Sequence, residues 1–408
     1  MKLDENDATR RAGLARLEAF TPRMGEAYAA NRNIDKGREA PANVSELSPF
    51  LRHRLISEKE AAAAAIGAHG VDGSFKFLQE VCWRTYFKGW LEYRPGVWKL
   101  YGEARDRDFS AMESDPSLRS RYEEAIAGQA GIDGFDDWAL ELVETGYLHN
   151  HARMSFASIW MFTLDLPWTL GADFFLQHLL DGDPASNTLS WRWVAGLHTQ
   201  GKTYLASPKA IEVCSDGRFS PSGLAENAPP VKGFANPDPA PLPPADALPD
   251  EAFGLLITED DLWPEGFIPA DAPVASVAGF CAPDARSPRR ASEQASRFTR
   301  AALENALVRA EAAYGVPARN FSDADNPAAA LADWAHDLRT KTIVLPWQPT
   351  GWSRDRLAPL LGGLRGQGFK LLEVRRRWDE VFWPHTRKGY FKLRQSIPTL
   401  LAQTGLTE

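Results

Sequence analysis

Cysteine is scarce in this chain of 408 residues, which contains only 3 of them. Cys82, Cys214 and Cys281 are odd in number and far apart, so one chain cannot build a disulfide framework or a four-thiolate metal cluster from them. Cys82 stands in an apolar segment, where a cysteine is usually a small buried hydrophobic residue. The sequence therefore predicts no metal site.

Long apolar runs are also missing. No run reaches the roughly 18 apolar residues that indicate a membrane-spanning helix. Charges interrupt the first stretch, residues 1–20, which consequently lacks the apolar centre of a secretory signal. We therefore expect a cytoplasmic protein without a membrane partner.

An excess of positive charge is absent too, since the formal net charge is −8. Such a chain is not expected to coat duplex DNA through an overall basic field, although this charge leaves room for a local basic groove. Tryptophan, by contrast, is abundant, with 14 residues. Because a buried indole N–H needs a partner, these residues indicate either a tryptophan-rich core or aromatic surfaces that stack on a planar ligand or on bases.

Helical periodicity extends to about residue 220. Large apolar side chains recur at spacings of three and four residues in 74–93 and again in 135–164. The following stretch, 221–251, is rich in proline and alanine and has no periodicity, which indicates a linker lying over a surface. We therefore predict an all-helical domain over residues 1–220, followed by this linker.

The pattern changes after the linker. Short apolar runs alternate with helical segments, which is typical of a mostly parallel sheet with right-handed crossovers. The predicted strands are 253–258, 273–280, 342–347 and 369–374, and the predicted helices are 291–314, 327–340 and 353–365. No glycine-rich phosphate motif follows these strands, which argues against a dinucleotide site. The expected fold class is thus an all-helical domain followed by a smaller α/β domain, residues 252–408.

One short stretch, DGDPASNTLSWRW, concentrates acidic, amide and aromatic side chains. It contains Asp181, Asp183, Asn187, Trp191 and Trp193. Taken singly, an acid beside an arginine in a helical bundle is most often structural, and a tryptophan most often belongs to the core. The combination within thirteen residues is more specific than any of its members.

Three other stretches accompany this motif. They are QEVCWR with Glu80, Trp83 and Arg84, TGYLHNHARM with Asn150, Arg153 and Met154, and YAANRNIDKGREAPANVSELSP with Tyr28, Ser45, Leu47 and Ser48. In these motifs, their order and their spacing, the chain resembles the flavin-binding domain of the photolyase/cryptochrome family. The resemblance covers about residues 25–215.

The resemblance implies FAD as the cofactor and assigns residues to it. The residues expected to bind the diphosphate and ribose of FAD are Tyr28, Ser45, Leu47, Ser48 and Arg84. Arg153, tied to Asp181, is expected beside the isoalloxazine, and Asp183 near the ring and the ribose. Asn187 is expected to face flavin N5, where a neutral amide can donate or accept as the redox state changes. The cofactor supplies the difficult chemistry, and the protein tunes it.

The same resemblance implies an activity, the light-driven repair of cyclobutane pyrimidine dimers in UV-damaged DNA. The residues expected to form the lesion pocket are Glu80, Trp83, Asn150, Met154 and Trp193. Trp191 and Trp168 match the first two members of the family's electron-transfer chain. The third falls near Asp115 instead of a tryptophan, which leaves Trp160 and Trp138 as candidates.

Other branches of the family fit less well. Repair of the (6-4) photoproduct needs histidine where this chain has Asn150 and Met154, and the iron–sulfur branch needs four cysteines. Plant-type cryptochromes carry aspartate in place of Asn187. The alternative function is nevertheless that of a cryptochrome-like blue-light photoreceptor without repair activity. A third possible function is that of a redox flavoprotein that uses FAD in the dark.

The order of the expected domains is unusual, because the antenna-like α/β domain follows the flavin domain. The chain resembles in this respect a small bacterial branch specialised for single-stranded DNA, and we expect a monomer. Candidate residues for a DNA groove are Arg52, Arg54, Arg192, Lys202 and the basic aromatic run 374–395. The sequence leaves open whether the α/β domain binds a second, antenna chromophore.

Overall fold

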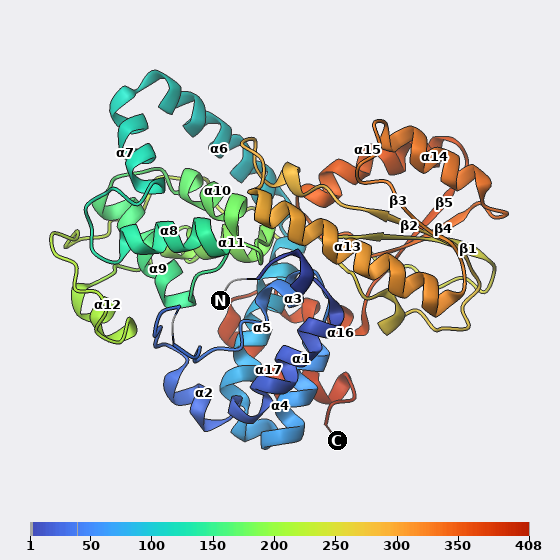
Figure 1. Cartoon of the computed structure of the whole chain (residues 1–408), viewed down its shortest axis with the longest axis horizontal. Helices are drawn as coiled ribbons and strands as arrows, with labels where there is room; N and C mark the ends of the chain where they lie inside the picture. The colour runs from blue at the N-terminus through green and yellow to red at the C-terminus, as the bar shows by residue number, and fades with distance from the viewer. Residues whose placement is uncertain (1–2, 39, 408) are drawn as a thin grey trace.

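A helical part and a sheet part lie side by side in the computed structural model of the chain (Figure 1). The structure describes residues 3–38 and 40–407. None of the helices within these ranges is long and apolar enough to cross a membrane. The helices and the parallel sheet confirm the fold class expected from the sequence.

Within the described residues, twelve α-helices precede the linker. They are α1 (Arg10–Phe20), α2 (Glu26–Asn31), α3 (Ser48–Arg52), α4 (Glu58–Gly73), α5 (Phe75–Glu92), α6 (Gly96–Ser114), α7 (Pro116–Ile126), α8 (Phe135–Thr145), α9 (Asn150–Ser158), α10 (Trp168–His178), α11 (Pro184–Val194) and α12 (Pro208–Cys214). Short helical turns lie at η1 (Glu5–Asp7), η2 (Thr21–Arg23) and η3 (Ile159–Thr163). The prediction of helical structure in this half is confirmed.

The starts of the helices near the motifs follow from local sequence. Ser57 caps α4 in a capping box with Glu60, which satisfies backbone N–H groups that the first turn leaves free. Gly146 ends α8 in the left-handed conformation (φ 66°), which costs glycine little. Asp183 caps α11 by accepting a hydrogen bond from the Ser186 N–H, so the motif at 181–193 spans a loop and a helix start.

The predicted linker contains no helix or strand and crosses both parts of the molecule. Backbone hydrogen bonds join Val231 N–H to Ala195 O and Ala240 N–H to Tyr93 O on the helical side. Asp246 N–H donates to Glu373 O at the edge of the sheet. These bonds hold the segment against the surface.

In the part of the chain that the structure describes, the sheet has five parallel strands in the order β3-β2-β1-β4-β5. They are β1 (Phe253–Thr258), β2 (Val274–Phe280), β3 (Ala318–Asn320), β4 (Thr342–Pro346) and β5 (Lys370–Val374), with η4 (Pro264–Gly266), η5 (Pro283–Arg286), α13 (Glu293–Tyr314), α14 (Pro327–Asp337) and α15 (Trp352–Gly366) between them. Side chains alternate along β1, because Leu255 belongs to the core that includes α13, whereas Leu256 belongs to the core under α14 and α15. The sheet is therefore covered on both faces.

The residues that follow β5 return to the helical part. α16 (Arg377–Phe382), η6 (Trp383–His385) and α17 (Tyr390–Gln403) all pack against α5. The Trp378 indole N–H donates to Thr85 Oγ1 at 3.0 Å. A side chain at Gly89 would lie 2.6 Å from Thr386 Oγ1, so the glycine permits the close approach of η6. The domain boundaries expected from the sequence stay a prediction, but this last segment packs on helices rather than extending the sheet.

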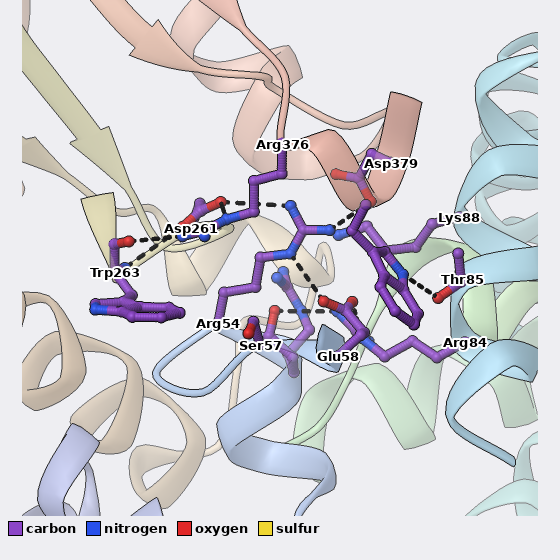
Figure 2. A network of polar contacts seen from close by, with 12 residues as sticks. Arg54, Ser57, Glu58, Arg84, Thr85, Lys88, Asp261, Trp263, Arg376 and Asp379 are labelled. Carbon is purple, nitrogen blue, oxygen red and sulfur yellow. Dashed lines mark hydrogen bonds and ion pairs between the residues drawn. The ribbon is translucent and has the colours of Figure 1, made fainter. Parts of the chain in front are cut away.

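The carboxyl ends of β1 and β4 face the helical part, and buried ion pairs join the two. Figure 2 shows Arg54 between Glu58, Asp261 and Asp379, with contacts of 3.4, 3.3 and 2.7 Å. Arg376 donates to both oxygens of Asp261 at 2.6 and 2.7 Å. The charges contributed by the two parts are thus complementary at this interface.

The interface corrects one expectation from the sequence. Arg52, Arg54 and Arg192 were expected to line a DNA groove, but their exposed fractions are 0%, 5% and 0%. Arg52 and Arg54 are buried because carboxylates that follow β1 neutralise them, and Arg192 donates to Phe234 O and to Asn236 Oδ1. That part of the groove prediction is wrong, although Lys202 is exposed.

Candidate functional site

Three of the motifs meet at the end of α3, the middle of α5 and the loop before α11. Arg52 Nε donates to Gly182 O at 2.7 Å, and Arg84 Nη2 donates to Arg52 O at 3.2 Å. Arg84 Nη1 lies 3.4 Å from Asp183 Oδ2. The stretches that carry the sequence resemblance are therefore neighbours in space.

Asp183 lies at the centre of a group of cations. Its Oδ2 lies 3.4 Å from Arg84, 3.9 Å from Lys88 and 4.0 Å from Arg52. Burial by itself would raise the pKa of Asp183, but these three cations together hold that pKa well below its usual value. The carboxylate is consequently charged at neutral pH, with three positive groups converging on it.

Arg153 and Asp181 form the pair that the sequence led us to expect. Arg153 Nη2 donates to Asp181 Oδ2 at 2.9 Å, and its Nε donates to Leu148 O at 2.8 Å. The other oxygen of Asp181 is buried, and no described residue donates a hydrogen bond to it. A buried acceptor without a donor fits a polar ligand beside α9.

Asn187 lies one turn into α11 and is buried. Its Nδ2 donates to Ala172 O at 2.8 Å, and no described side chain or N–H group donates to its Oδ1. This arrangement fixes the amide against α10 and leaves a polar atom for a ligand. Among the described residues, no group of three or more side chains is placed to hold a metal ion.

The expected electron-transfer residues lie in the core of the helical part. The ring of Trp191 has its centroid 6.3 Å from that of Trp160, and the two rings are nearly perpendicular. Trp168 packs on Tyr101 at 5.5 Å. Trp138 packs instead on Phe219 at 5.7 Å. Of the two candidates for the missing third member, Trp160 is therefore the one in ring contact with Trp191.

Glu80 and Arg32 form an ion pair of 2.9 Å beside the expected lesion pocket. Burial raises the pKa of Glu80, and Arg32 and Lys76 oppose this rise. The carbonyl of Arg32 accepts a hydrogen bond from His149 Nε2 at 3.1 Å, at the start of α9. Arg32 thus links Glu80 on α5 to the helix that carries Asn150.

Asn150 and Met154 lie one turn apart on α9. The side chain of Asn150 is exposed, with its Nδ2 3.7 Å from Met154 Sδ. Trp193, on α11, is half-buried and stacks on Tyr204 with ring centroids 5.7 Å apart. These three side chains are accessible enough to contact a substrate.

Trp83 has a partner that the sequence did not suggest. Tyr390, at the start of α17, stacks on it with centroids 3.5 Å apart and planes 12° apart. Tyr86 and Phe87 flank the same indole. One face of Trp83 is therefore covered by the C-terminal helix, and the indole is half-buried.

The residues expected at the diphosphate and ribose have mixed surroundings. Tyr28 packs edge-on against Phe20 and Phe77, and burial raises the pKa of its hydroxyl. Leu47 is a core residue at 1% exposure. Ser45 lines a cavity of about 500 Å³ between α1 and residues 41–50. Ser48 is the first residue of α3, and the described residues show no hydrogen bond from these serines to Arg84.

Two charged residues of the site were missed in the sequence. Lys88 lies four residues after Arg84, on the same face of α5, and this spacing was the available signal. Arg32 follows α2 as its C-cap, four residues after Tyr28. Arg32 lies within the stretch 28–49 that carries the resemblance, but no role was assigned to it, and Lys88 lies outside the motifs.

Comparisons with known proteins show which proteins this chain is similar to. Residues 77–220 match a family model described as the FAD binding domain of DNA photolyase. A deoxyribodipyrimidine photo-lyase from Synechococcus is 32% identical over 191 residues, which cover 45% of this chain and 38% of that protein. A deoxyribodipyrimidine photo-lyase from Thermus thermophilus is 31% identical over 230 residues, covering 56% of this chain and 52% of that protein.

Two solved structures are also similar to this chain. A class III photolyase from Agrobacterium tumefaciens is 24% identical with a TM-score of 0.40, over 51% of this chain and 43% of its own. A cryptochrome from Synechocystis is 24% identical with a TM-score of 0.42, over 50% of this chain and 42% of its own. The match covers about half, or less, of the length of the two photo-lyases named above. The resemblance to the photolyase/cryptochrome family is confirmed, and the matched model supports FAD as the cofactor.

Proposed function

We propose that the protein splits cyclobutane pyrimidine dimers in UV-damaged DNA with light, on the premise that residues 77–220 match the FAD-binding domain of DNA photolyase. One observation carries the proposal: Glu80, Trp83 and Arg84 lie on the helix that contacts Asp183. A flavin held by Arg84 and Asp183 would therefore lie next to side chains suited to a pyrimidine lesion.

The residues around Asp181 and Asp183 fit the polar parts of FAD. Arg84 and Lys88 carry positive charge toward the loop at 181–183, which suits a diphosphate. The free oxygen of Asp181 can accept a hydrogen bond, and the amide of Asn187 can either donate or accept one. When bound, reduced and excited by blue light, FAD supplies the electron that opens the cyclobutane ring.

The lesion would meet Glu80, Asn150 and the two indoles. The raised pKa of Glu80 increases its protonated fraction, so that it can donate to a pyrimidine carbonyl as well as accept from an N–H group. Trp193, and the face of Trp83 that Tyr390 does not cover, offer apolar surface to the extruded pair of bases. Because a dimer stacks and pairs poorly, its extrusion costs less than that of an intact base.

We also propose that a single strand is the preferred substrate. The net charge of −8 is unfavourable for the phosphates of a duplex, and the buried arginines at positions 52, 54 and 192 are not available to them. A single strand can be held by stacking together with a few exposed cations. The expectation that the protein acts as a monomer stays a prediction.

The proposed activity is tested with UV-irradiated oligothymidine, as a single strand and annealed to its complement. Purified protein with reduced flavin is mixed with each substrate and illuminated, and the return of base absorbance near the usual ~260 nm band is followed. We expect recovery in light and none in the dark, and faster recovery for the single strand. No recovery with either substrate contradicts repair and favours a photoreceptor.

Glu80→Gln tests the lesion contact specifically. We expect affinity for the irradiated oligonucleotide to fall by about 1–2 kcal/mol, because an amide replaces the carboxyl group that would form hydrogen bonds with the pyrimidine edges. Affinity for the unirradiated oligonucleotide should not change. Fluorescence anisotropy with a labelled oligonucleotide measures both, and Glu123→Gln on the exposed surface of α7 is the matched control. An equal loss for both oligonucleotides would contradict a contact with the lesion.

A further inference from the structure

The segment after β5 brings an aromatic and basic surface beside the candidate lesion site. Tyr390 anchors it, because its hydroxyl donates to Gln79 O at 2.6 Å while its ring stacks on Trp83. Arg94 Nη2 donates to Arg387 O at 3.0 Å and fixes the turn that precedes α17. The start of α17 is therefore held against α5, next to Glu80 and Trp83.

Phe391 follows this anchor and points away from the core. It is 72% exposed, the highest exposure among the large hydrophobic side chains that are exposed in the described part of the chain. The others in that group are the aliphatic residues Leu14, Leu140, Val143, Val213 and Val308. An exposed ring next to a fixed aromatic pair is typical of a binding surface rather than of a core.

Positively charged residues flank Phe391 in the sequence. The cations are Arg387, Lys388, Lys392 and Arg394, and residues 384–403 contain no aspartate or glutamate. Within the described ranges, no carboxylate lies close enough to any of these four side chains to form an ion pair. In a chain with a net charge of −8, this group is complementary to a polyanion.

We propose that Phe391 and the cations from Arg387 to Arg394 form a docking surface for an unpaired DNA strand next to the lesion. A ring can stack on any exposed base, and the cations can neutralise neighbouring phosphates, which are the two contacts that hold single strands without sequence preference. The position of the strand relative to the lesion rests on the proposed repair function. The surface lies outside residues 77–220, which match the photolyase model.

Phe391→Ala tests the stacking contact. Affinity for unirradiated oligothymidine is expected to fall about 5- to 100-fold, as for the loss of one base–aromatic contact. Phe391→Leu should lose as much, whereas Phe391→Trp should bind like the original protein, because only an aromatic ring stacks. Val308→Ala, at a residue 64% exposed on α13, is the control for loss of an exposed hydrophobic side chain.

A Lys388→Ala and Lys392→Ala double variant tests the phosphate contacts. Its plot of log affinity against log salt concentration should be less steep by about 1.4, since each phosphate contact to a single strand contributes about 0.7. The control is Lys341→Ala with Lys370→Ala, at exposed positions at the amino ends of β4 and β5. Circular dichroism and thermal melting confirm that each variant is folded.

These measurements separate the docking surface from repair. They use undamaged DNA, so the surface can be supported even if light-driven repair is absent. Unchanged affinity in Phe391→Ala together with an unchanged salt slope in the lysine variant would overturn the proposal. So would a loss of self-association, measured by sedimentation, without a loss of DNA affinity.

Discussion

Arg54→Ala is expected to lower the free energy of unfolding by about 3–5 kcal/mol, because the change leaves buried carboxylates without their cation. Arg54 lies between Glu58, Asp261 and Asp379, with a 5% exposed fraction. Glu58 and Asp261 retain Arg84 and Arg376 as partners, whereas Asp379 has no other ion-pair partner in the described part of the chain. Denaturant unfolding followed by tryptophan fluorescence measures the effect.

A second substitution shows whether charge causes this loss. Asp379→Asn in the Arg54→Ala background should recover part of the stability, because it removes the carboxylate that was left alone. Arg377→Ala, at a mostly exposed arginine paired with Glu380, should change stability by no more than about 0.5 kcal/mol. A loss in Arg54→Ala as small as that of this control would mean that the ion pairs do not hold the two parts together.

Asp181→Ala is expected to weaken FAD binding by about 10- to 100-fold. The carboxylate has one free buried oxygen and orients Arg153, so its loss removes a charge-assisted hydrogen bond and loosens a neighbour of the flavin. Titration of apoprotein with FAD, followed by the change in flavin fluorescence, measures the affinity. Asp181→Asn should be intermediate, because an amide keeps an acceptor but loses the charge.

The control for Asp181→Ala is Asp284→Ala. Asp284 also pairs with an arginine, Arg300 at 3.7 Å, but on the surface of the α/β part. It should leave FAD affinity unchanged. Equal FAD affinity in Asp181→Ala and in the original protein would place the flavin elsewhere, provided that both proteins melt at similar temperatures.

The sequence predicted the parts of the fold that depend on local patterns. Four of the five strands lie within two residues of the predicted runs, because buried parallel strands are short and apolar. The exception is β3, a three-residue edge strand whose side chains are half-buried or exposed and show no hydrophobic run. The pair of Arg153 and Asp181 was also predicted, since both residues belong to recognisable motifs.

Contacts between distant segments could not be predicted in the same way. Arg52 looks like a solvent-exposed cation in its own helix, but Asp260, 208 residues further on, forms a buried ion pair with it. Trp83 looked like an open wall of a pocket until Tyr390 was found stacked on it. In both cases the partner comes from the C-terminal half of the chain. The family motifs lie before this half, so they could not predict which of its residues contact the helical part.

The most direct measurement of light-driven repair is the fluorescence lifetime of the reduced flavin bound to this protein. If the lesion lies against the flavin between α9 and the loop at 181–183, electron transfer competes with emission. UV-irradiated oligothymidine should then shorten the lifetime, whereas unirradiated oligothymidine at saturating concentration should not. An unchanged lifetime with the irradiated strand demonstrably bound would contradict electron transfer from the flavin to the lesion.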